Sequence, residues 1–354
     1  RYGDRQLAAP HTTPEAPVIQ AIAREMADAG MTHMVLEASS HGLVLGRLGG
    51  CRFRVVAFTN LTQDHLDFHQ TMEAYGAAKR LLFTTAIEGN EEARAVVNLD
   101  SPYGQTILDH LRHPAVTISI DPASRAHIRP VGRPRYTIHG IDAVVQTPRG
   151  ECALQASLIG QHNLSNLLVA LGCCVQLGMD VQAACRGLSA IRTVPGRLER
   201  IQRDAEFAVL VDYAHTPDAL HRALLALKPL TAGRLITVFG CGGDRDNSKR
   251  PLMGEAVKKG TDIGIVTSDN PRTEDPDAIL EMILPGIDAP DMPRVACEGL
   301  ADTRRGYAVE RDRRTAIRAA VAAAGPGDIV LIAGKGHEDY QILGTEKIHF
   351  DDRE

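Results

Sequence analysis

Four short polar motifs in the second half of the chain contain residue types that could form a ligand-binding site. Each follows directly on an apolar run typical of a buried β-strand: FAVLVDYAHTPDAL (207–220), LITVFGCGGDRD (235–246), IGIVTSDNPR (263–272) and DIVLIAGKGHED (328–339). In open α/β sheets, ligands bind beyond the carboxyl ends of parallel strands. The four motifs therefore predict one shared cleft, lined by Gly, Asp, His and Arg.

Two of these motifs suit a nucleotide or another anion. Asp212 ends its strand at a helix start, where a carboxylate can accept ribose hydroxyls or hold water on a metal. The glycine-rich loop after residue 239 allows a close backbone approach, and a Gly-rich loop with basic residues behind it favours anion binding. Its basic residues are Arg245, Lys249 and Arg250.

The third motif combines Asp269, Asn270, Pro271 and Arg272. A carboxylate, an amide and a guanidinium on a proline-stiffened turn fit a ligand with both ammonium and carboxylate groups, that is, an amino acid. The alternative is a salt bridge within the loop. In the fourth motif Asp339 stands where a dinucleotide fingerprint needs its third glycine, which disfavours an NAD-binding fold.

The first half contains a candidate metal site. Glu37 ends a predicted strand at 34–37 and is followed by Ser39, a pairing that suits Mg²⁺. Alternatively, Glu37 accepts hydrogen bonds from nearby backbone amides. After the next strand, residues 58–69 predict a metal or phosphate site, or an ordinary helix start. The possible ligands there are Asn60, Thr62, Asp64, His65, Asp67 and His69.

Three further sets are ambiguous from the residues alone. Lys79 lies on a predicted helix, where a lysine usually extends into solvent. Asn163 and Asn166 are one helical turn apart and can face one ligand, although Asn163 also suits a helix cap. Thr12 and Thr13 can hold a phosphate or sugar at a helix N-terminus, or can simply cap that helix.

Alternating strands and helices must position these residues. A helix is expected to begin with Thr13 and Pro14 and to end at Gly30. Short β-rich pieces between about 115 and 160 predict an antiparallel extension, and a linker-like segment at 192–200 predicts a domain boundary near 194. The other expected elements are strands 54–58 and 93–98 and helices 72–83, 105–111, 163–178 and 181–191.

Composition limits the class of protein. The 354 residues suffice for about two domains, and 44% hydrophobic residues with 4% aromatic ones predict cores of Leu, Val, Ile and Ala. A net charge of -5 argues against a general nucleic-acid binder. Seven cysteines without a CxxC pair predict buried thiols in a reducing cytosol rather than a zinc site or disulfide framework. With neither a long apolar run nor a signal peptide, we expect a soluble, cytoplasmic protein without a membrane span.

In chain order, eleven motifs resemble those of the Mur ligase family over nearly the whole chain: HTTP, EASSHGL, FTNLTQDHLDFH, AAKRLLF, GQHNLSN, PGRLE, DYAHTPDAL, GCGGDRD, KRPLMG, DNPR and GKGHEDYQ. The resemblance implies an α/β fold. A central ATPase-type domain at 1–194 has a mostly parallel sheet with an antiparallel extension, and a Rossmann-like C-terminal domain at 195–354 binds the amino acid.

The resemblance also implies an activity. Such a protein is an ATP-dependent acid–amino-acid ligase of peptidoglycan precursor synthesis, which adds meso-2,6-diaminopimelate to UDP-N-acetylmuramoyl-L-alanyl-D-glutamate (the UDP-muramoyl dipeptide) through an acyl phosphate. The implied cofactors are ATP and Mg²⁺, and the implied partners are small-molecule substrates of a cytoplasmic monomer.

Roles for single residues follow from the resemblance. The catalytic and magnesium-binding residues are Glu37, His65 and Lys79, with Lys79 carbamylated to N6-carboxylysine. The UDP-muramoyl dipeptide is bound by Thr12, Thr13, Ser39 and Arg47. ATP is bound by Asn163, Arg197 and Asp212, from both domains and the linker. Diaminopimelate is bound by Arg245, Asp269, Asn270, Pro271, Arg272, Gly334 and Glu338.

Arg272 carries the specificity argument. Diaminopimelate has a distal carboxylate that lysine lacks, and a buried guanidinium left without an anion costs roughly 3–5 kcal/mol. The DNPR motif therefore predicts diaminopimelate rather than lysine.

The chain departs from the family pattern in places. The Gly-rich phosphate loop ending in GK[ST] is expected to precede residue 1, together with a uridine-binding domain. We therefore expect a truncated sequence that is a poor catalyst alone. His11 and Leu45 also differ from common family residues. The alternatives are a folylpolyglutamate synthase-like ligase, a non-catalytic nucleotide-binding pseudoenzyme, and a metal hydrolase built on Asp64, His65 and His69.

Overall fold

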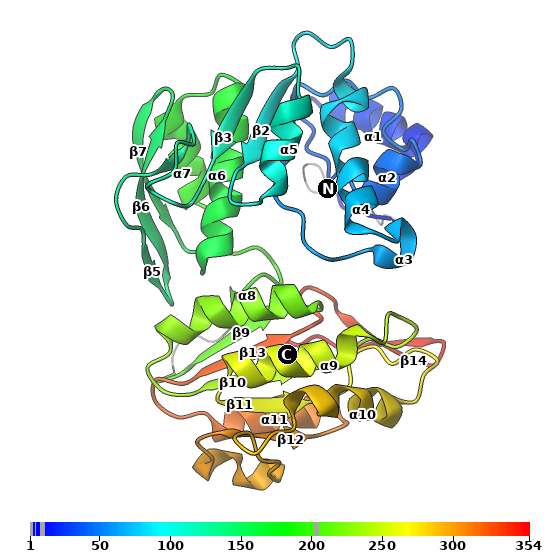
Figure 1. Cartoon of the computed structure of the whole chain (residues 1–354), viewed down its shortest axis with the longest axis vertical. Helices are drawn as coiled ribbons and strands as arrows, with labels where there is room; N and C mark the ends of the chain where they lie inside the picture. Colours follow the sequence, from blue (N-terminus) through cyan, green and yellow to red (C-terminus); the bar gives the residue numbers. More distant parts are fainter. Residues whose placement is uncertain (1–2, 4, 8–10, 202–204) are drawn as a thin grey trace. The chain divides into compact units, whose positions relative to one another are not determined.

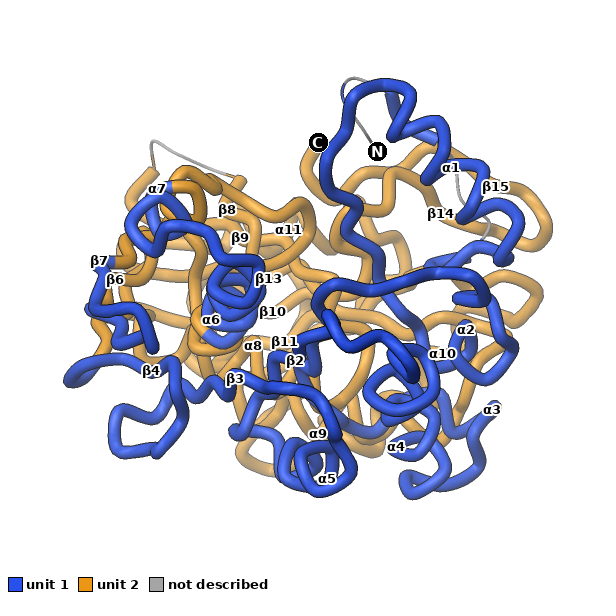
Figure 2. The backbone as a smooth tube through the Cα atoms, turned by 90° about the horizontal axis from the view of Figure 1, so that it is seen from above, with its two compact units in different colours: residues 1–133, 144–153, 165–186 blue, residues 134–143, 154–164, 187–354 orange. Residues whose placement is uncertain are grey.

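The computed structural model describes residues 3, 5–7, 11–201 and 205–354 in two compact units (Figure 2). The first unit contains residues 1–133, 144–153 and 165–186, and the second contains 134–143, 154–164 and 187–354. The middle of the chain thus contributes to both units. A domain boundary near residue 194 stays a prediction.

The first unit is built on a short parallel sheet. Strands β1 (Val55–Phe58), β2 (Arg94–Asn98) and β3 (Ala115–Ile118) pair in the order β1-β2-β3. Alternate residues of β1 and β2 are buried against Phe83 and Ile107, which makes this face of the sheet the core. The helices of this part are α1 (Ala16–Asp28), α2 (Ser40–Val44), α3 (Leu66–His69), α4 (Met72–Arg80), η1 (Leu81–Phe83), η2 (Thr85–Ile87) and α5 (Tyr103–His110).

The predicted antiparallel extension is confirmed. It is a four-stranded sheet in which β6 pairs with β4, β5 and β7, and two helices follow it. Its strands are β4 (Arg129–Pro130), β5 (Arg135–Thr137), β6 (Gly140–Thr147) and β7 (Gly150–Ala156), and the helices are α6 (Gln161–Gln176) and α7 (Val181–Ser189).

The second unit contains a six-stranded sheet in the order β12-β11-β10-β13-β9-β8. Its neighbours are parallel except β8, which runs antiparallel to β9. The strands are β8 (Glu199–Arg200), β9 (Ala208–Asp212), β10 (Leu235–Phe239), β11 (Ile263–Val266), β12 (Gly306–Val309) and β13 (Ile329–Ala333). A hairpin of β14 (Tyr340–Leu343) and β15 (Glu346–His349) follows.

Helices cover both faces of this sheet (Figure 1). Helices α8, α9 and α10 share one apolar cluster with the sheet, whereas α11 and η4 share the other. They are α8 (Pro217–Leu227), η3 (Lys228–Leu230), α9 (Lys249–Gly260), α10 (Pro276–Ile287), η4 (Cys297–Asp302) and α11 (Arg313–Ala323). Within the described ranges, no helix combines the length and apolarity that crossing a membrane requires.

The sheet order brings the four polar motifs to one edge. Strands β11, β10, β13 and β9 are consecutive neighbours and parallel, so their carboxyl ends lie side by side. Every residue of these four strands is buried, as expected for a sheet covered on both faces. The motifs that follow them therefore meet, as the sequence predicts.

Two local predictions in the first unit are wrong. Residues 34–37 have no strand partner in the part of the chain that the structure describes, and Val35 is 97% exposed. An apolar run becomes a strand only where a neighbouring strand pairs with it, so Glu37 lies in an irregular segment. Thr13 is not a helix cap either, because α1 begins at Ala16 with Glu15 at the N-cap position.

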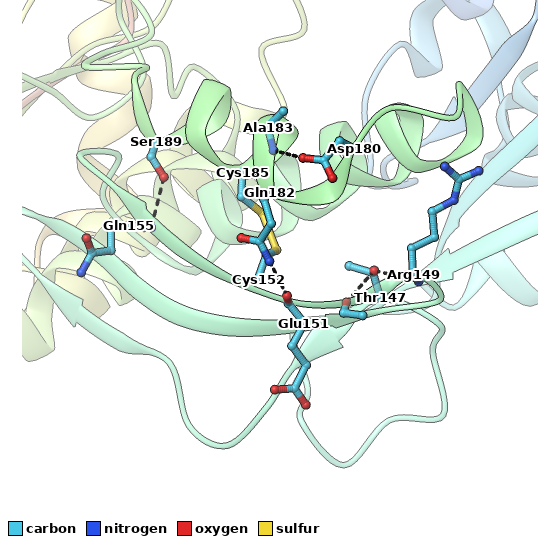
Figure 3. The surroundings of a disulfide bond; sticks show 11 residues. Thr147, Arg149, Glu151, Cys152, Gln155, Asp180, Gln182, Ala183, Cys185 and Ser189 are labelled. Atoms are coloured by element: carbon cyan, nitrogen blue, oxygen red, sulfur yellow. Dashed lines mark hydrogen bonds between the residues drawn. A yellow bond between two sulfur atoms is a disulfide. The ribbon is translucent and has the colours of Figure 1, made fainter.

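Two cysteines form a disulfide that the sequence does not predict. Cys152 on β7 and Cys185 on α7 are joined where the helix packs on the strand (Figure 3). They are 33 residues apart in sequence, and such a spacing carries no signal. The other five cysteines are free thiols, as predicted, but only Cys241 among them is buried. By chain-entropy arguments, a closed loop of this length stabilises the fold by about 3–4 kcal/mol.

Candidate functional site

Thr13 organises the first group of predicted residues. Its buried hydroxyl donates to Glu37 O at 2.7 Å and accepts from Ser39 N at 2.9 Å. Arg47 donates to Thr13 O at 3.2 Å, and its Nε lies 2.8 Å from a carboxylate oxygen of Glu15. These contacts bring Thr13, Ser39, Arg47 and the Glu37 backbone together. Thr12 is exposed beside them.

Ser39 also caps α2, because its Oγ accepts a hydrogen bond from Gly42 N at 3.1 Å. A side chain at Gly42 would lie 2.8 Å from Thr13 Cγ2, so only glycine allows this close approach. The segment around Ser39 is thus held by side-chain contacts with Thr13 rather than by a strand.

A cluster of aromatic and imidazole rings lies beside Lys79 of helix α4. The rings of His69 and Tyr75 stack at 5.1 Å with 20° between their planes, and Lys79 Nζ lies 5.0 Å from the Tyr75 ring centroid. His69 Nε2 also contacts Ser40 Oγ at 2.8 Å. The His41 ring lies 4.9 Å from that of His65. Lys79 is therefore half-buried beside an aromatic ring, not extended into solvent as the residue alone suggested.

The charge environment of Lys79 is unusual for a lysine. Burial lowers the pKa of its ammonium, and the nearby carboxylates of Glu37 and Asp64 act in the opposite direction. Burial also raises the pKa of Tyr75 to about 12, so its phenol is neutral at physiological pH. A lysine with a lowered pKa has a larger share of neutral, nucleophilic amine.

The predicted metal ligands lie on three separate segments. His65 is a surface residue in left-handed conformation just before α3, and Glu37 is exposed in the irregular segment. In the described ranges, no three or more His, Cys, Asp or Glu side chains gather closely enough to hold a metal ion. This excludes a self-contained set of Asp64, His65 and His69 in this structure.

Asp212 is the centre of a second group, in the second unit. Its buried carboxylate accepts hydrogen bonds from Leu198 N at 2.7 Å and from Ala214 N at 2.9 Å. Burial raises the pKa of Asp212 to about 6, although both hydrogen bonds and the charge of Arg197 act against this rise. Arg197 itself is exposed and lies 5.1 Å over the Tyr213 ring.

The start of α6 belongs to the same unit. Asn163 is buried and donates to Ile159 O at 2.8 Å. Its neighbour His162 has a pKa lowered to about 4 by burial and by the charges of Arg197 and Arg222. The three predicted ATP residues, Asn163, Arg197 and Asp212, therefore all lie in the second unit.

The glycine-rich loop after β10 packs against the next motif. Cβ atoms at Gly240 and Gly243 would clash with backbone oxygens of Thr267 and Pro271, at 2.3 and 1.8 Å. Arg250, which the sequence pattern assigned to anion binding behind this loop, is instead used within the protein. Arg250 is fully buried and forms a bidentate ion pair with Glu274 at 2.8 and 2.9 Å.

The other two basic residues of the loop differ from Arg250. Arg245 is exposed, and Lys249 Nζ donates to His215 O at 3.2 Å. The positive charge available to a ligand beside this loop therefore comes from Arg245 in the loop and Lys249 at the start of α9.

The turn from Asp269 to Arg272 is fixed by the β14 strand. Ile342 N donates to Asn270 Oδ1 at 3.0 Å, and Gln341 Nε2 donates to Asp269 O at 2.6 Å. Arg272 has φ of 52° and is held by backbone hydrogen bonds to Ile342 and Gly344 at 3.1 and 2.7 Å. A positive φ is uncommon for a non-glycine residue and costs of order 1–3 kcal/mol, so the surrounding contacts must hold it.

Gly334 and Glu338, from the motif after β13, reach the same turn. A Cβ at Gly334 would lie 2.5 Å from Asp269 Oδ2, and the glycine has φ of 119°. Glu338 accepts a hydrogen bond from Asn270 Nδ2 at 3.0 Å. Gly334 and Glu338 are thus neighbours of the turn. The structure brings together six of the residues predicted to bind diaminopimelate: Asp269, Asn270, Pro271, Arg272, Gly334 and Glu338.

Sequence reasoning missed two residues at this edge. Tyr213 lies near Glu338, Asp269, Arg197 and Arg245, all of which act on the pKa of its phenol, which is raised mainly by burial. Lys335 has a side chain that is 0% exposed and lies between Asn270 and Glu338. A lysine between two glycines after a fully buried strand is the signal that could have identified it.

Comparisons with known proteins agree on one family. Residues 2–174 match the Mur ligase middle domain, and residues 196–336 match the domain described as Mur ligase, glutamate ligase domain. A UDP-N-acetylmuramoyl-L-alanyl-D-glutamate--2,6-diaminopimelate ligase of Geobacter metallireducens is 45% identical, over 100% of this chain and 70% of that protein. The protein of the same name from Gloeobacter violaceus is 49% identical, over 100% of this chain and 68% of its own length.

Solved structures give the same result. A structure of UDP-N-acetylmuramoyl-L-alanyl-D-glutamate--2,6-diaminopimelate ligase superposes with a TM-score of 0.64 at 38% identity, covering 97% of this chain and 67% of that one. Mycobacterium tuberculosis folylpolyglutamate synthase, complexed with ADP and AMPPCP, has a TM-score of 0.61 at 22% identity, covering 79% of this chain and 61% of that one. The second likeness shows a shared fold alone.

Proposed function

Because the chain belongs to the Mur ligase family, we propose that it joins meso-2,6-diaminopimelate to UDP-N-acetylmuramoyl-L-alanyl-D-glutamate at the expense of ATP. The family consists of ATP-dependent ligases that act on small-molecule substrates. The observation that carries the choice of amino acid is the turn Asp269–Arg272, which presents a carboxylate, an amide and a guanidinium within four consecutive residues. The amide of this turn donates to Glu338, and its guanidinium donates to Gly243 O.

The proposed reaction has two steps. The γ-phosphate of ATP is transferred to the glutamate carboxylate of the dipeptide, which releases ADP and gives an acyl phosphate. The neutral amino group of diaminopimelate then attacks the acyl carbon and forms the C–N bond of a tetrahedral intermediate. The amine loses one proton, the acyl C–O bond breaks and phosphate leaves. All matched residues come from one chain, so a monomer suffices, and we assign the reaction to the cytoplasm because it consumes ATP.

The first unit supplies the proposed cation site. The neutral amine of Lys79 can attack CO₂, form a C–N bond and lose one proton to water, which gives a carbamate anion. The lowered pKa of Lys79 supports this step, because it increases the share of neutral amine. Glu37, His65 and the carbamate oxygens would then hold Mg²⁺, which neutralises phosphate charge when bound. Thr12, Thr13, Ser39 and Arg47 are proposed to bind the UDP-muramoyl dipeptide.

The second unit supplies the proposed nucleotide and amino-acid sites. We assign ATP contacts to Asn163, Arg197 and Asp212, since an ionised buried carboxylate can accept ribose hydroxyls. In the amino-acid site, the carboxylates of Asp269 and Glu338 suit the ammonium of an amino acid. The guanidinium groups of Arg245 and Arg272 suit its carboxylates.

The role of Asp212 predicts a pH dependence. Its pKa of about 6 means that it is ionised at pH 7.5 and becomes protonated as the pH falls. If the ionised form accepts from ATP, the KM for ATP should rise about fourfold by pH 5.5. The Asp212→Asn variant has no such group to titrate, so its KM for ATP should change little between these pH values. If the KM for ATP rose equally in the wild type and in Asp212→Asn as the pH falls, the assignment of Asp212 to ATP would be contradicted.

A direct assay tests the proposed function. The complete gene product that contains residues 1–354 is incubated with ATP, Mg²⁺, the UDP-muramoyl dipeptide and diaminopimelate, and the UDP-muramoyl tripeptide is measured by mass spectrometry. We expect one ADP and one phosphate per tripeptide, and little product when lysine replaces diaminopimelate. Nucleotide binding without any product would favour the pseudoenzyme. Ligation of glutamate to a folate would instead favour the folylpolyglutamate synthase alternative.

A further inference from the structure

Lys335 is a fully buried lysine at the edge where the four motifs meet. Its Nζ donates to Asn270 Oδ1 and to a carboxylate oxygen of Glu338, both at 3.3 Å, and to the backbone carbonyl of Tyr340. These three acceptors match the three hydrogens of an ammonium group. Because the side chain is 0% exposed and its donors are used internally, Lys335 does not contact a substrate.

Two of the acceptors of Lys335, Asn270 and Glu338, are among the residues assigned to diaminopimelate. The Asn270 amide has a defined orientation, since its oxygen accepts from Lys335 and from Ile342 N, and its nitrogen donates to Glu338 at 3.0 Å. Lys335 and Asn270 contact the same oxygen of Glu338. One buried ammonium thus fixes an amide, a carboxylate and the first residue of β14.

The ammonium of Lys335 determines how the side chains of Asn270 and Glu338 are oriented. Without the ammonium, the Asn270 amide loses one of the two donors that keep its oxygen turned inward, and the Glu338 carboxylate loses its neighbouring positive charge. Both side chains could then rotate, and binding would have to pay the cost of ordering them again.

We propose that Lys335 is a positioning residue for the amino-acid substrate: its buried ammonium holds the Asn270 amide and the Glu338 carboxylate in place, so that Glu338 is oriented to receive the ammonium group of the incoming amino acid. This inference rests on the proposed function, because it assumes that these two residues bind an amino acid. It assigns to Lys335 an effect on the groups common to all amino acids, and leaves the recognition of a distal carboxylate to Arg272.

The test is the Lys335→Met variant of the complete gene product, assayed beside the wild type. We expect the KM for diaminopimelate to rise roughly tenfold or more. The KM values for ATP and the UDP-muramoyl dipeptide should stay within about twofold of the wild type. The ratio of diaminopimelate to lysine turnover should change little, since Lys335 does not act on the distal carboxylate.

Arg234→Met is the matched control. Arg234 is a largely buried cation of the same unit that donates to Asp328 and to backbone carbonyls, but it immediately precedes β10. It therefore lies at the opposite end of the strands from the four motifs. We expect this variant to lower the melting temperature without raising the KM for diaminopimelate.

Several outcomes would overturn the inference. One is an unchanged KM for diaminopimelate in Lys335→Met, and another is an equal rise of all three KM values, which would indicate a general structural defect. If Lys335→Met does not fold, Lys335→Gln, whose amide retains two N–H donors, is subject to the same criteria. A wild-type protein that forms no tripeptide would instead refute the proposed function itself.

Discussion

Replacing Lys79 with either methionine or arginine is expected to lower kcat by about 100-fold or more, because both changes would remove the proposed carbamate and its negative charge. Lys79→Arg is the informative variant, since it keeps a positive charge next to the Tyr75 ring but cannot take up CO₂. If Lys79 acts as an ordinary cation, arginine should preserve much of the activity. Steady-state kinetics of the complete gene product measure this difference.

The proposed carbamate on Lys79 also predicts that the activity responds to CO₂. Wild-type activity should fall in CO₂-depleted buffer and return when bicarbonate is added, whereas Lys79→Arg should not respond. With ¹³C-labelled bicarbonate, the wild type should show a carbamate signal by NMR that Lys79→Arg lacks. An arginine variant with more than about half the wild-type kcat would contradict the carbamate role.

The strands and the shared edge could be predicted from the sequence because they depend on local patterns. Each of β9, β10, β11 and β13 is an apolar run of four or five residues buried on both faces, followed at once by glycine or polar residues. Such a run indicates a parallel strand without knowledge of its partners. The alternation with helices then indicates which ends of the strands meet.

The predictions that failed concern residues whose contacts are with residues far away in the sequence. The hydroxyl of Thr13 contacts residues 24 and 26 positions further along the chain, so its local sequence indicates only a helix cap or a phosphate- or sugar-binding residue, and not these contacts. Arg250 was predicted to bind an anion, but the anion it binds is Glu274 of the same chain. The apolar run at 34–37 lacks a partner strand among the described residues, and periodicity cannot reveal that.

The buried polar groups were the least predictable part of the candidate site. Lys335 occurs in a motif whose glycine spacing dominates the sequence pattern, and a lysine is rarely fully buried. Its burial becomes understandable only when Asn270 and Glu338, 65 and 3 residues away, are seen as its acceptors. Residues of this kind are identified by charge pairing in the fold.

Replacing Arg272 with alanine should reduce the preference for diaminopimelate over lysine. The structure lowers the cost expected from the sequence, because Arg272 is half-buried rather than fully buried. A hydrogen bond to a charged group contributes about 1.5–3 kcal/mol. The ratio of the kcat/KM values for the two amino acids should therefore fall by about 10- to 100-fold.

The backbone around Arg272 is held by hydrogen bonds that the Arg272→Ala variant retains. Arg272 Nη1 donates to Gly243 O at 2.7 Å, which uses one of the five N–H donors of the guanidinium. Its positive φ is imposed by β14, where the residue pairs with Leu343 as an isolated bridge. Alanine retains the backbone hydrogen bonds, although it does not favour this conformation either, so the main change is the loss of the guanidinium.

Arg311→Ala provides the control for Arg272→Ala. Arg311 is an arginine of the same unit whose ion pair with Asp277 spans 3.0 Å at the surface, and such pairs contribute about 0–1 kcal/mol. Its removal should leave the ratio of diaminopimelate to lysine turnover unchanged. If Arg272→Ala also leaves that ratio unchanged while the complete wild-type enzyme prefers diaminopimelate, the distal carboxylate must be recognised elsewhere. Arg245, exposed on the neighbouring glycine-rich loop, would then be the next residue to replace.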